Sequence, residues 1–164
     1  MLPNRSPYSL IQEDLWPDEW KCLVACVMLN CTTRRQVEKV LPVFFRRWPT
    51  AADVSQANPD EVSQIISTLG FKNRRTASLI RLAKEYSKKN WTHVHELPGI
   101  GEYASRMWEM FFLNFLGDDK PHDGALTMYW VWRKRTSLSS SHLPNDKFFN
   151  DLSVDEKGEM RTIF

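Results

Sequence analysis

Residues 97–104 read LPGIGEYA, and this stretch decides which kind of helical protein the chain can form. Two glycines separated by one apolar residue permit a tight hairpin, so the backbone N–H groups of Gly99, Ile100 and Gly101 are expected to point outward at the start of the next helix. Amide donors and the positive end of a helix dipole both favour a phosphate, which predicts an anion site. The same spacing also occurs in ordinary turns between packed helices, where the glycines act only as caps.

Apolar residues recur at helical spacing on both sides of the hairpin and almost nowhere alternate as they do in strands. We therefore expect an all-α fold. Asn58 and Pro59 mark the start of one helix, Gly70 marks its end, and Pro42 is expected to kink another. Six apolar stripes predict six helices, and they fall within residues 20–28, 37–48, 62–69, 79–86, 104–115 and 126–130.

Composition predicts one folded domain whose basic surface is confined to one segment of the chain. The chain has 164 residues, of which 42% are apolar and 12% aromatic, enough for one real core. A net charge of +2 is too small to indicate a nucleic-acid binder, so a basic footprint has to come from one segment. Residues 72–89 are that segment, and they include Lys72, Arg74 and Arg75; they could equally form a solvated helix face.

The domain is expected to span residues 1–135, followed by a polar, flexible tail at residues 136–164 with a short helical turn near Phe148 and Phe149. Cys22, Cys26 and Cys31 lack the spacing of zinc sites and are odd in number, so we expect reduced thiols, the first two of them buried in a helix. Residues 1–5 show no signal pattern, and no apolar run is long enough for a membrane span, which predicts a soluble intracellular protein without membrane association.

The hairpin string resembles that of the helix-hairpin-helix DNA glycosylases of the endonuclease III superfamily. That superfamily carries a catalytic aspartate about twenty residues after the hairpin, at the start of the next helix, and Asp123 stands there. Breaking an N-glycosidic bond builds positive charge on the deoxyribose, which a fixed carboxylate stabilises while it helps to activate water. An aspartate at this place also caps a helix well, and the two roles can coexist.

The resemblance further implies a monofunctional enzyme without a cofactor. Bifunctional members use a lysine two residues after the second glycine to form a Schiff base, whereas this chain has Tyr103 there. The iron–sulfur cluster of many relatives needs four cysteines near the C-terminal end of the domain, and this chain has none there. We therefore expect hydrolysis alone, with no metal and no cofactor.

Six short strings narrow the resemblance to the catalytic domain of methyl-CpG-binding-domain mismatch thymine/uracil DNA glycosylases. They are RSPY, LIQE, WK, MLN, LGF and GIGEY, and they lie within residues 5–135. The resemblance implies that Gln12 and Tyr103 line the pocket for a flipped pyrimidine and that Phe71 is the wedge inserted into the stack. From the residues alone, Gln12 could be a surface polar residue, Tyr103 a core residue, and Phe71 a contact that closes the helix end.

Two positions depart from the family pattern. Cys31 stands where relatives carry an arginine that helps to fill the gap left by the flipped base, and Ala125 stands where the pattern is basic. Cys31 is therefore placed beside the DNA, but it is too short to do what an arginine would do. We therefore expect weaker gap filling and one phosphate contact fewer than in those relatives.

Together these features predict a monomeric, monofunctional DNA glycosylase that removes thymine or uracil opposite guanine from duplex DNA. Extrusion is least costly for a mispaired base, which gives mismatch selectivity a physical source. Lys72, Arg74 and Arg75, with the hairpin amides, would hold the strand, and the resemblance implies a nuclear location. Two alternatives stay open: a non-catalytic protein that binds DNA through the same hairpin, and a helical interaction module whose motif match is accidental.

Overall fold

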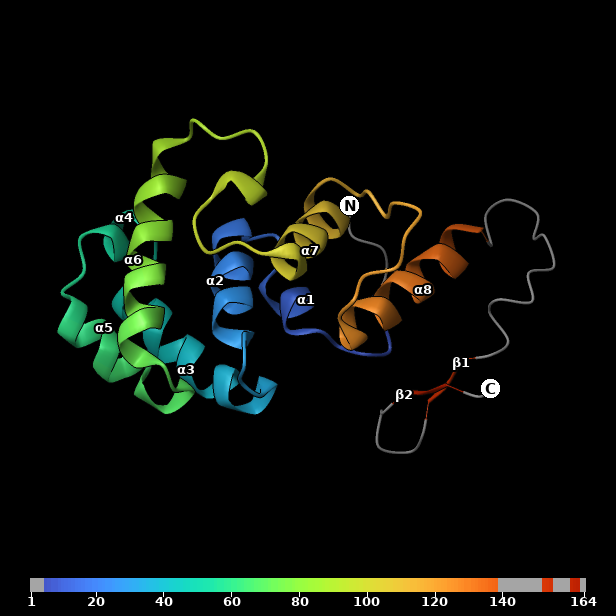
Figure 1. Cartoon of the computed structure of the whole chain (residues 1–164), viewed down its shortest axis with the longest axis horizontal. Coiled ribbons are helices and arrows are strands. Elements are labelled where there is room, and N and C mark those ends of the chain that lie inside the picture. Colours follow the sequence, from blue (N-terminus) through green and yellow to red (C-terminus); the bar gives the residue numbers. More distant parts are fainter. Residues whose placement is uncertain (1–4, 139–151, 155–159, 163–164) are drawn as a thin grey trace. The chain divides into compact units, whose positions relative to one another are not determined.

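The computed structural model of the chain describes residues 5–138 and, for the backbone, the strands at 152–154 and 160–162 (Figure 1). They fall into two compact units, Met1–Phe115 and Leu116–Phe164, and each is described here by itself. Residues 5–138 contain helices and no strands, so the predicted all-α fold is confirmed. The helical turn expected near Phe148 and Phe149 lies outside the described residues.

The first unit is built around α2, which packs against α1, α3, α6 and α7 (Figure 1). Its seven buried residues leave little of it in contact with solvent, as a central helix requires. The elements of this unit are α1 (Ile11–Leu15), α2 (Glu19–Leu29), α3 (Arg34–Arg47), α4 (Ala51–Ser55), α5 (Pro59–Ile65), the 3₁₀ turn η1 (Ser67–Leu69), α6 (Lys72–Lys88), the 3₁₀ turn η2 (Val94–Glu96) and α7 (Glu102–Phe112).

The start signal of the third predicted helix is confirmed, but the α-helix ends at Ile65, before Gly70. The Asn58 side chain accepts a hydrogen bond from the Asp60 amide at 2.8 Å, and Pro59 occupies the first helical position. Gly70, with φ of +73°, follows the 3₁₀ turn that ends this segment. Pro42 lies inside α3, which continues to Arg47, and the kink expected there stays a prediction.

One part of the predicted core is wrong. Phe115 was expected to continue the apolar stripe of α7, but that helix ends at Phe112 and the Phe115 side chain is 56% exposed. Asn114, in a left-handed conformation with φ of +55°, turns the chain away from the helical path before Phe115 is reached. The apolar spacing therefore extends further than the helix does.

A carboxylate joins three helices of the first unit. Glu19, in the first turn of α2, accepts hydrogen bonds from the Tyr86 hydroxyl of α6 at 2.8 Å and from Trp108 Nε1 of α7 at 2.7 Å. Burial, and next the bond to Glu19, raises the pKa of Tyr86, so the phenol stays protonated and donates. The negative charge also faces the positive end of α2.

The second unit contains α8 (Gly124–Leu138) and the antiparallel strands β1 (Leu152–Val154) and β2 (Met160–Thr162). Trp130 of α8 donates its indole N–H to the Leu116 carbonyl at 2.7 Å, which fixes the chain that leads toward the helix. The helix continues beyond residue 135, where the tail was expected to begin. No helix in the described part of the chain is long and apolar enough to cross a membrane.

Replacing Glu19 should destabilise the first unit. In Glu19→Ala the buried donors of Tyr86 and Trp108 lose their acceptor, so the free energy of unfolding should fall by about 1–3 kcal/mol in urea denaturation. Glu38→Ala removes an exposed i,i+4 ion pair with Arg34 and should cost less than about 0.5 kcal/mol. Equal losses in the two variants would contradict the assigned role of Glu19.

Candidate functional site

The predicted hairpin forms between η2 and α7. The Ile100 amide donates to the Leu97 carbonyl at 3.3 Å, and Gly99 has φ of +79°, a conformation that L side chains rarely adopt. Gly99 and Gly101 are exposed, and a Cβ at Gly101 would meet nothing within 4 Å. The expectation that the Ile100 amide points outward is therefore wrong, whereas Gly99 and Gly101 lie open to solvent directly before the N-terminus of α7, as an anion site requires.

A small polar cluster fixes the approach to the hairpin. His93, just before η2, contacts Glu109 of α7 through Nε2 at 3.2 Å, and Arg106 donates to the other oxygen of Glu109 at 2.7 Å. The His93 ring also packs edge-on against Trp108, with 4.9 Å between ring centroids. These contacts hold the two flanks of the turn together.

Two predicted pocket residues meet. Gln12 of α1 is only 1% exposed, and its Nε2 donates to the Tyr103 hydroxyl at 2.8 Å and to Cys26 Sγ at 3.5 Å. Gln12 is therefore no surface residue, and Tyr103 is only half-buried, so it is no core residue either. The fold therefore brings Gln12 into contact with Tyr103, which is 91 positions further along the chain and lies in the first turn of α7.

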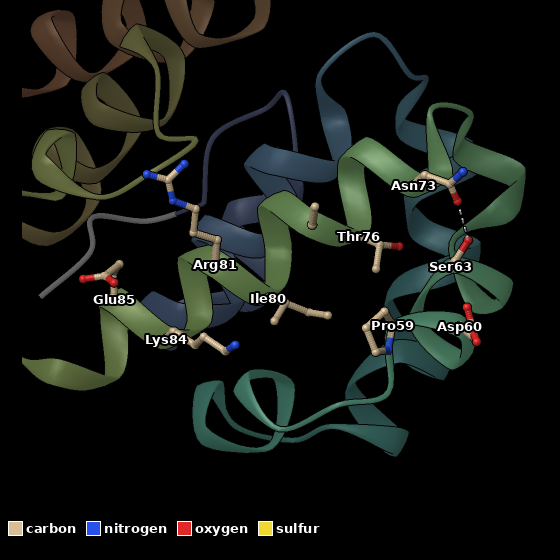
Figure 2. A pocket seen from close by; sticks show the side chains of 10 residues that line it. Pro59, Asp60, Ser63, Asn73, Thr76, Ile80, Arg81, Lys84 and Glu85 are labelled. Atoms are coloured by element: carbon tan, nitrogen blue, oxygen red, sulfur yellow. Dashed lines mark hydrogen bonds between the residues drawn. The ribbon is translucent and has the colours of Figure 1, made fainter.

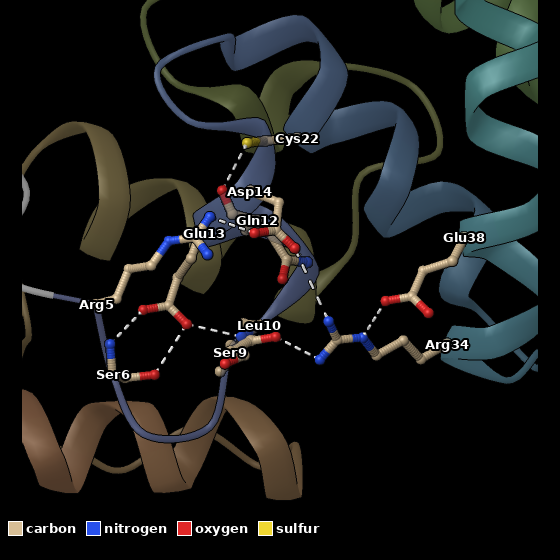
Figure 3. Close-up of polar contacts among 10 residues, drawn as sticks. All are labelled: Arg5, Ser6, Ser9, Leu10, Gln12, Glu13, Asp14, Cys22, Arg34 and Glu38. Atoms are coloured by element: carbon tan, nitrogen blue, oxygen red, sulfur yellow. Dashed lines mark hydrogen bonds and ion pairs between the residues drawn. The ribbon is translucent and has the colours of Figure 1, made fainter.

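The segment that carries Gln12 is fixed on both sides, as Figure 3 shows. The Glu13 carboxylate accepts from the Ser6 amide at 2.7 Å, from the Ser6 hydroxyl at 2.9 Å and from the Leu10 amide at 2.7 Å. On the α2 side, the Cys22 thiol donates to the Gln12 carbonyl at 3.7 Å. The short helix α1 is thus held by its own turn and by α2.

Phe71 stands out from the surface in front of α6. Its side chain is 71% exposed and its backbone is left-handed, with φ of +46°. The alternative in which Phe71 closes the helix end after Gly70 is wrong, because an aromatic ring in such a contact would be buried. A bulky residue at positive φ is uncommon and indicates either strain or function.

The prediction that Arg75 contacts DNA is corrected by its environment. Arg75 is 7% exposed, and its guanidinium donates to five backbone carbonyls at 2.7–3.4 Å, namely those of Val27, Met28, Asn30, Leu69 and Gly70. A guanidinium has five N–H donors, so none is left for a phosphate. Burial lowers the pKa of Arg75, and the nearby Cys31 opposes that shift.

Three other predicted DNA contacts have exposed side chains. Lys72 and Arg74 lie on the solvent side of the first turn of α6. Cys31, with φ of +58°, is exposed just after α2, and its thiol contacts the Asn30 side chain at 3.5 Å. These side chains are free to meet a ligand, whereas that of Arg75 is not.

Asp123 belongs to the second unit, directly before α8. Its Oδ1 accepts a hydrogen bond from the Leu126 amide at 2.9 Å, and the Thr127 amide donates to its carbonyl at 2.8 Å. The Thr127 hydroxyl in turn donates to the Pro121 carbonyl at 2.6 Å and fixes the turn that carries Asp123. The expected helix-capping role is therefore present, and Asp123 is exposed.

A groove of about 420 Å³ lies between α5 and α6, and the residues that line it do not include any of the predicted site residues (Figure 2). Thr76 lies on its wall, and its buried hydroxyl has no hydrogen-bond partner. Within the part of the chain that the structure describes, no group of three or more His, Cys, Asp or Glu side chains is arranged to hold a metal ion.

Sequence comparison identifies the family. Residues 24–155, which make up most of the chain, match the profile of the HhH-GPD superfamily base excision DNA repair proteins. The protein therefore belongs to that superfamily. It is 36% identical over 129 residues to a methyl-CpG-binding domain protein 4-like protein of Arabidopsis thaliana, and 38% identical over 95 residues to a thymine-DNA glycosylase of Aeropyrum pernix. These alignments cover 79% and 54% of this chain but only 29% and 43% of those relatives.

Solved structures share the fold. A thermostable thymine-DNA glycosylase matches 59% of this chain with a TM-score of 0.55, and an endonuclease III in a non-covalent complex with DNA matches 57% with a TM-score of 0.52. Both are 22% identical to this chain over the match, which covers 48% of each. The predicted helix-hairpin-helix glycosylase fold is thereby confirmed.

The three thiols should differ sharply in reactivity. Cys22 and Cys26 are 0% and 3% exposed, and burial raises the pKa of the Cys22 thiol, whereas Cys31 is exposed. The thiolate is the form that reacts, so iodoacetamide should label the native protein once, at Cys31, and the protein in urea three times. Peptide mass spectrometry measures the number and position of the labels. Labelling of Cys22 or Cys26 at the rate of Cys31 would contradict the packing of α2.

Proposed function

We propose that the protein is a monofunctional DNA glycosylase that releases mismatched thymine or uracil, opposite guanine, by hydrolysis of the N-glycosidic bond. The observation that carries this proposal is the contact between Gln12 and Tyr103 at 2.8 Å beside the open hairpin turn. The half-buried Tyr103 phenol can meet a pyrimidine edge, which offers carbonyl acceptors and an N–H donor, and the buried Gln12 amide donates to the phenol oxygen and holds it in place. Membership of a base excision repair superfamily supports the same substrate class.

Asp123 is the proposed catalytic carboxylate. It would stabilise the positive charge that develops on the deoxyribose and help to activate the attacking water. Support comes from its place at the start of α8, the next helix after α7, and from its exposed side chain. Bifunctional relatives have a lysine at the position of Tyr103, and its amine forms the Schiff base. Because a tyrosine has no amine, the product is expected to be an abasic site in an intact strand.

The test is base release from labelled duplexes that carry T:G, U:G, A:G or 8-oxoguanine pairs. Strands should break only after alkali, only in the T:G and U:G duplexes, and borohydride should trap no covalent adduct. Asp123→Asn should lower release by at least about a hundredfold, because Asn caps a helix comparably but carries no charge.

Three results would contradict parts of this proposal. Release by Asp123→Asn within a few-fold of the parent would remove the assigned role of Asp123. A borohydride-trapped adduct would overturn the monofunctional mechanism. Tight binding of mismatched duplex without any release would favour the non-catalytic DNA-binding alternative.

Gly101→Ala should weaken duplex binding with little effect on folding. The added methyl group meets no protein atom, but it stands where a phosphate would approach the amides, so affinity should fall by about tenfold or more. The free energy of unfolding should change by less than about 1 kcal/mol. Gly99→Ala, at φ of +79°, should instead cost about 1–2 kcal/mol of stability. Parental affinity in Gly101→Ala, measured by fluorescence anisotropy, would exclude the hairpin as a strand contact.

A further inference from the structure

Two exposed residues with left-handed backbones stand at the ends of separate segments. Cys31 follows α2 with φ of +58°, and Phe71 precedes α6 with φ of +46°. Such conformations persist only where the surrounding structure holds them. The side chain that holds these two segments is Arg75.

The guanidinium of Arg75 lies between the two segments and is saturated by them. Nη1 donates to the carbonyls of Val27 and Met28 at 2.7 and 3.3 Å, and Nη2 donates to the carbonyl of Asn30 at 3.0 Å. The remaining donors reach the turn before Phe71, from Nη2 to the Leu69 carbonyl and from Nε to the Gly70 carbonyl, both at 3.4 Å. One side chain therefore joins the end of α2 to the Phe71 turn.

The residue type fits this task closely. The last carbonyls of a helix have no partner within the helix, and a cation is favourable there because the helix dipole is negative at that end. Only arginine offers five donors in a rigid plane, whereas a lysine offers three from a single nitrogen. No other side chain is expected to satisfy both segments at once.

We infer that Arg75 is a positioning residue, whose buried guanidinium holds the Phe71 turn against the end of α2 so that the Phe71 ring is set for insertion before DNA binds. The inference rests on the proposed function, in which a base leaves the stack. A turn that is already ordered loses little conformational entropy on binding, so more of the ring's stacking energy is available for extrusion.

The test is single-turnover base release by Arg75→Lys from a U:G duplex and from the same uracil-containing strand left single. Misplacement of the wedge should lower the duplex rate by about tenfold or more and the single-strand rate by less than about threefold, because only the duplex requires a base to be displaced. Arg46→Lys, at an exposed position of α3 outside the basic segment, is the matched control and should leave both rates unchanged.

A double-mutant cycle with Phe71→Ala shows whether Arg75 acts through the ring. If it does, adding Arg75→Lys to Phe71→Ala should change the duplex rate little further, so the two effects are not additive. Additive effects would overturn the inference, as would equal loss on both substrates, which is the sign of a merely structural role. Should the parent release no base from either substrate, the proposed function fails and the inference with it.

A second variant covers the case in which Arg75→Lys does not fold. Gly70→Ala changes the same turn at a position where φ is +73° and where a Cβ meets no atom within 4 Å, so only the backbone of the turn is strained. It should fold and reproduce the duplex-selective loss. Parental duplex activity in a folded Gly70→Ala protein would show that the geometry of this turn is not what limits extrusion.

Discussion

A buried helix has to find partners for the polar groups at its two ends, and the first unit meets this requirement for α2 with charged side chains of opposite sign. At the N-terminal end, Glu19 is held by donors from α6 and α7. At the C-terminal end, Arg75 of α6 takes up the last carbonyls. Both charges have the sign that the helix dipole favours, so α6 and α7 are fixed to α2 by electrostatics as well as by apolar packing.

This arrangement connects the two halves of the candidate site in the first unit. The middle of α2 contributes Cys22 and Cys26, which contact the main chain and side chain of Gln12. Its end contributes the carbonyls that Arg75 binds, and through Arg75 the turn that carries Phe71. A shift of α2 would therefore move the Gln12 amide and the Phe71 turn together.

The sequence predicted the long helices and some of their ends because those signals are local. Periodic apolar stripes marked the helices, and Asn58 and Asp123 stand at helix starts as expected, whereas Gly70 follows the 3₁₀ turn η1 and not α5 itself. The short helices α1 and α4 were missed, since five residues are too few to show a period. The pairing of Gln12 with Tyr103 joins distant parts of the chain, and only the family resemblance pointed to it.

Arg75 shows where sequence reasoning failed and which signal it overlooked. A cluster of basic residues favours a solvated face, because arginine is rarely buried. Yet Arg75 precedes Leu79, Leu82 and Tyr86 by four, seven and eleven residues, which is the spacing of one helix face, and all three are buried. This spacing placed Arg75 on the buried face of α6, although its charge suggested that it faces solvent.

The backbone of Phe71 implies a conflict between stability and activity. Glycine or asparagine would relieve the left-handed strain at this position, and either would remove an exposed apolar ring from the free protein. Selection for thermostability alone would therefore discard the aromatic residue. Libraries screened only for folding should lose this phenylalanine first, whereas libraries screened for the proposed base release should retain it.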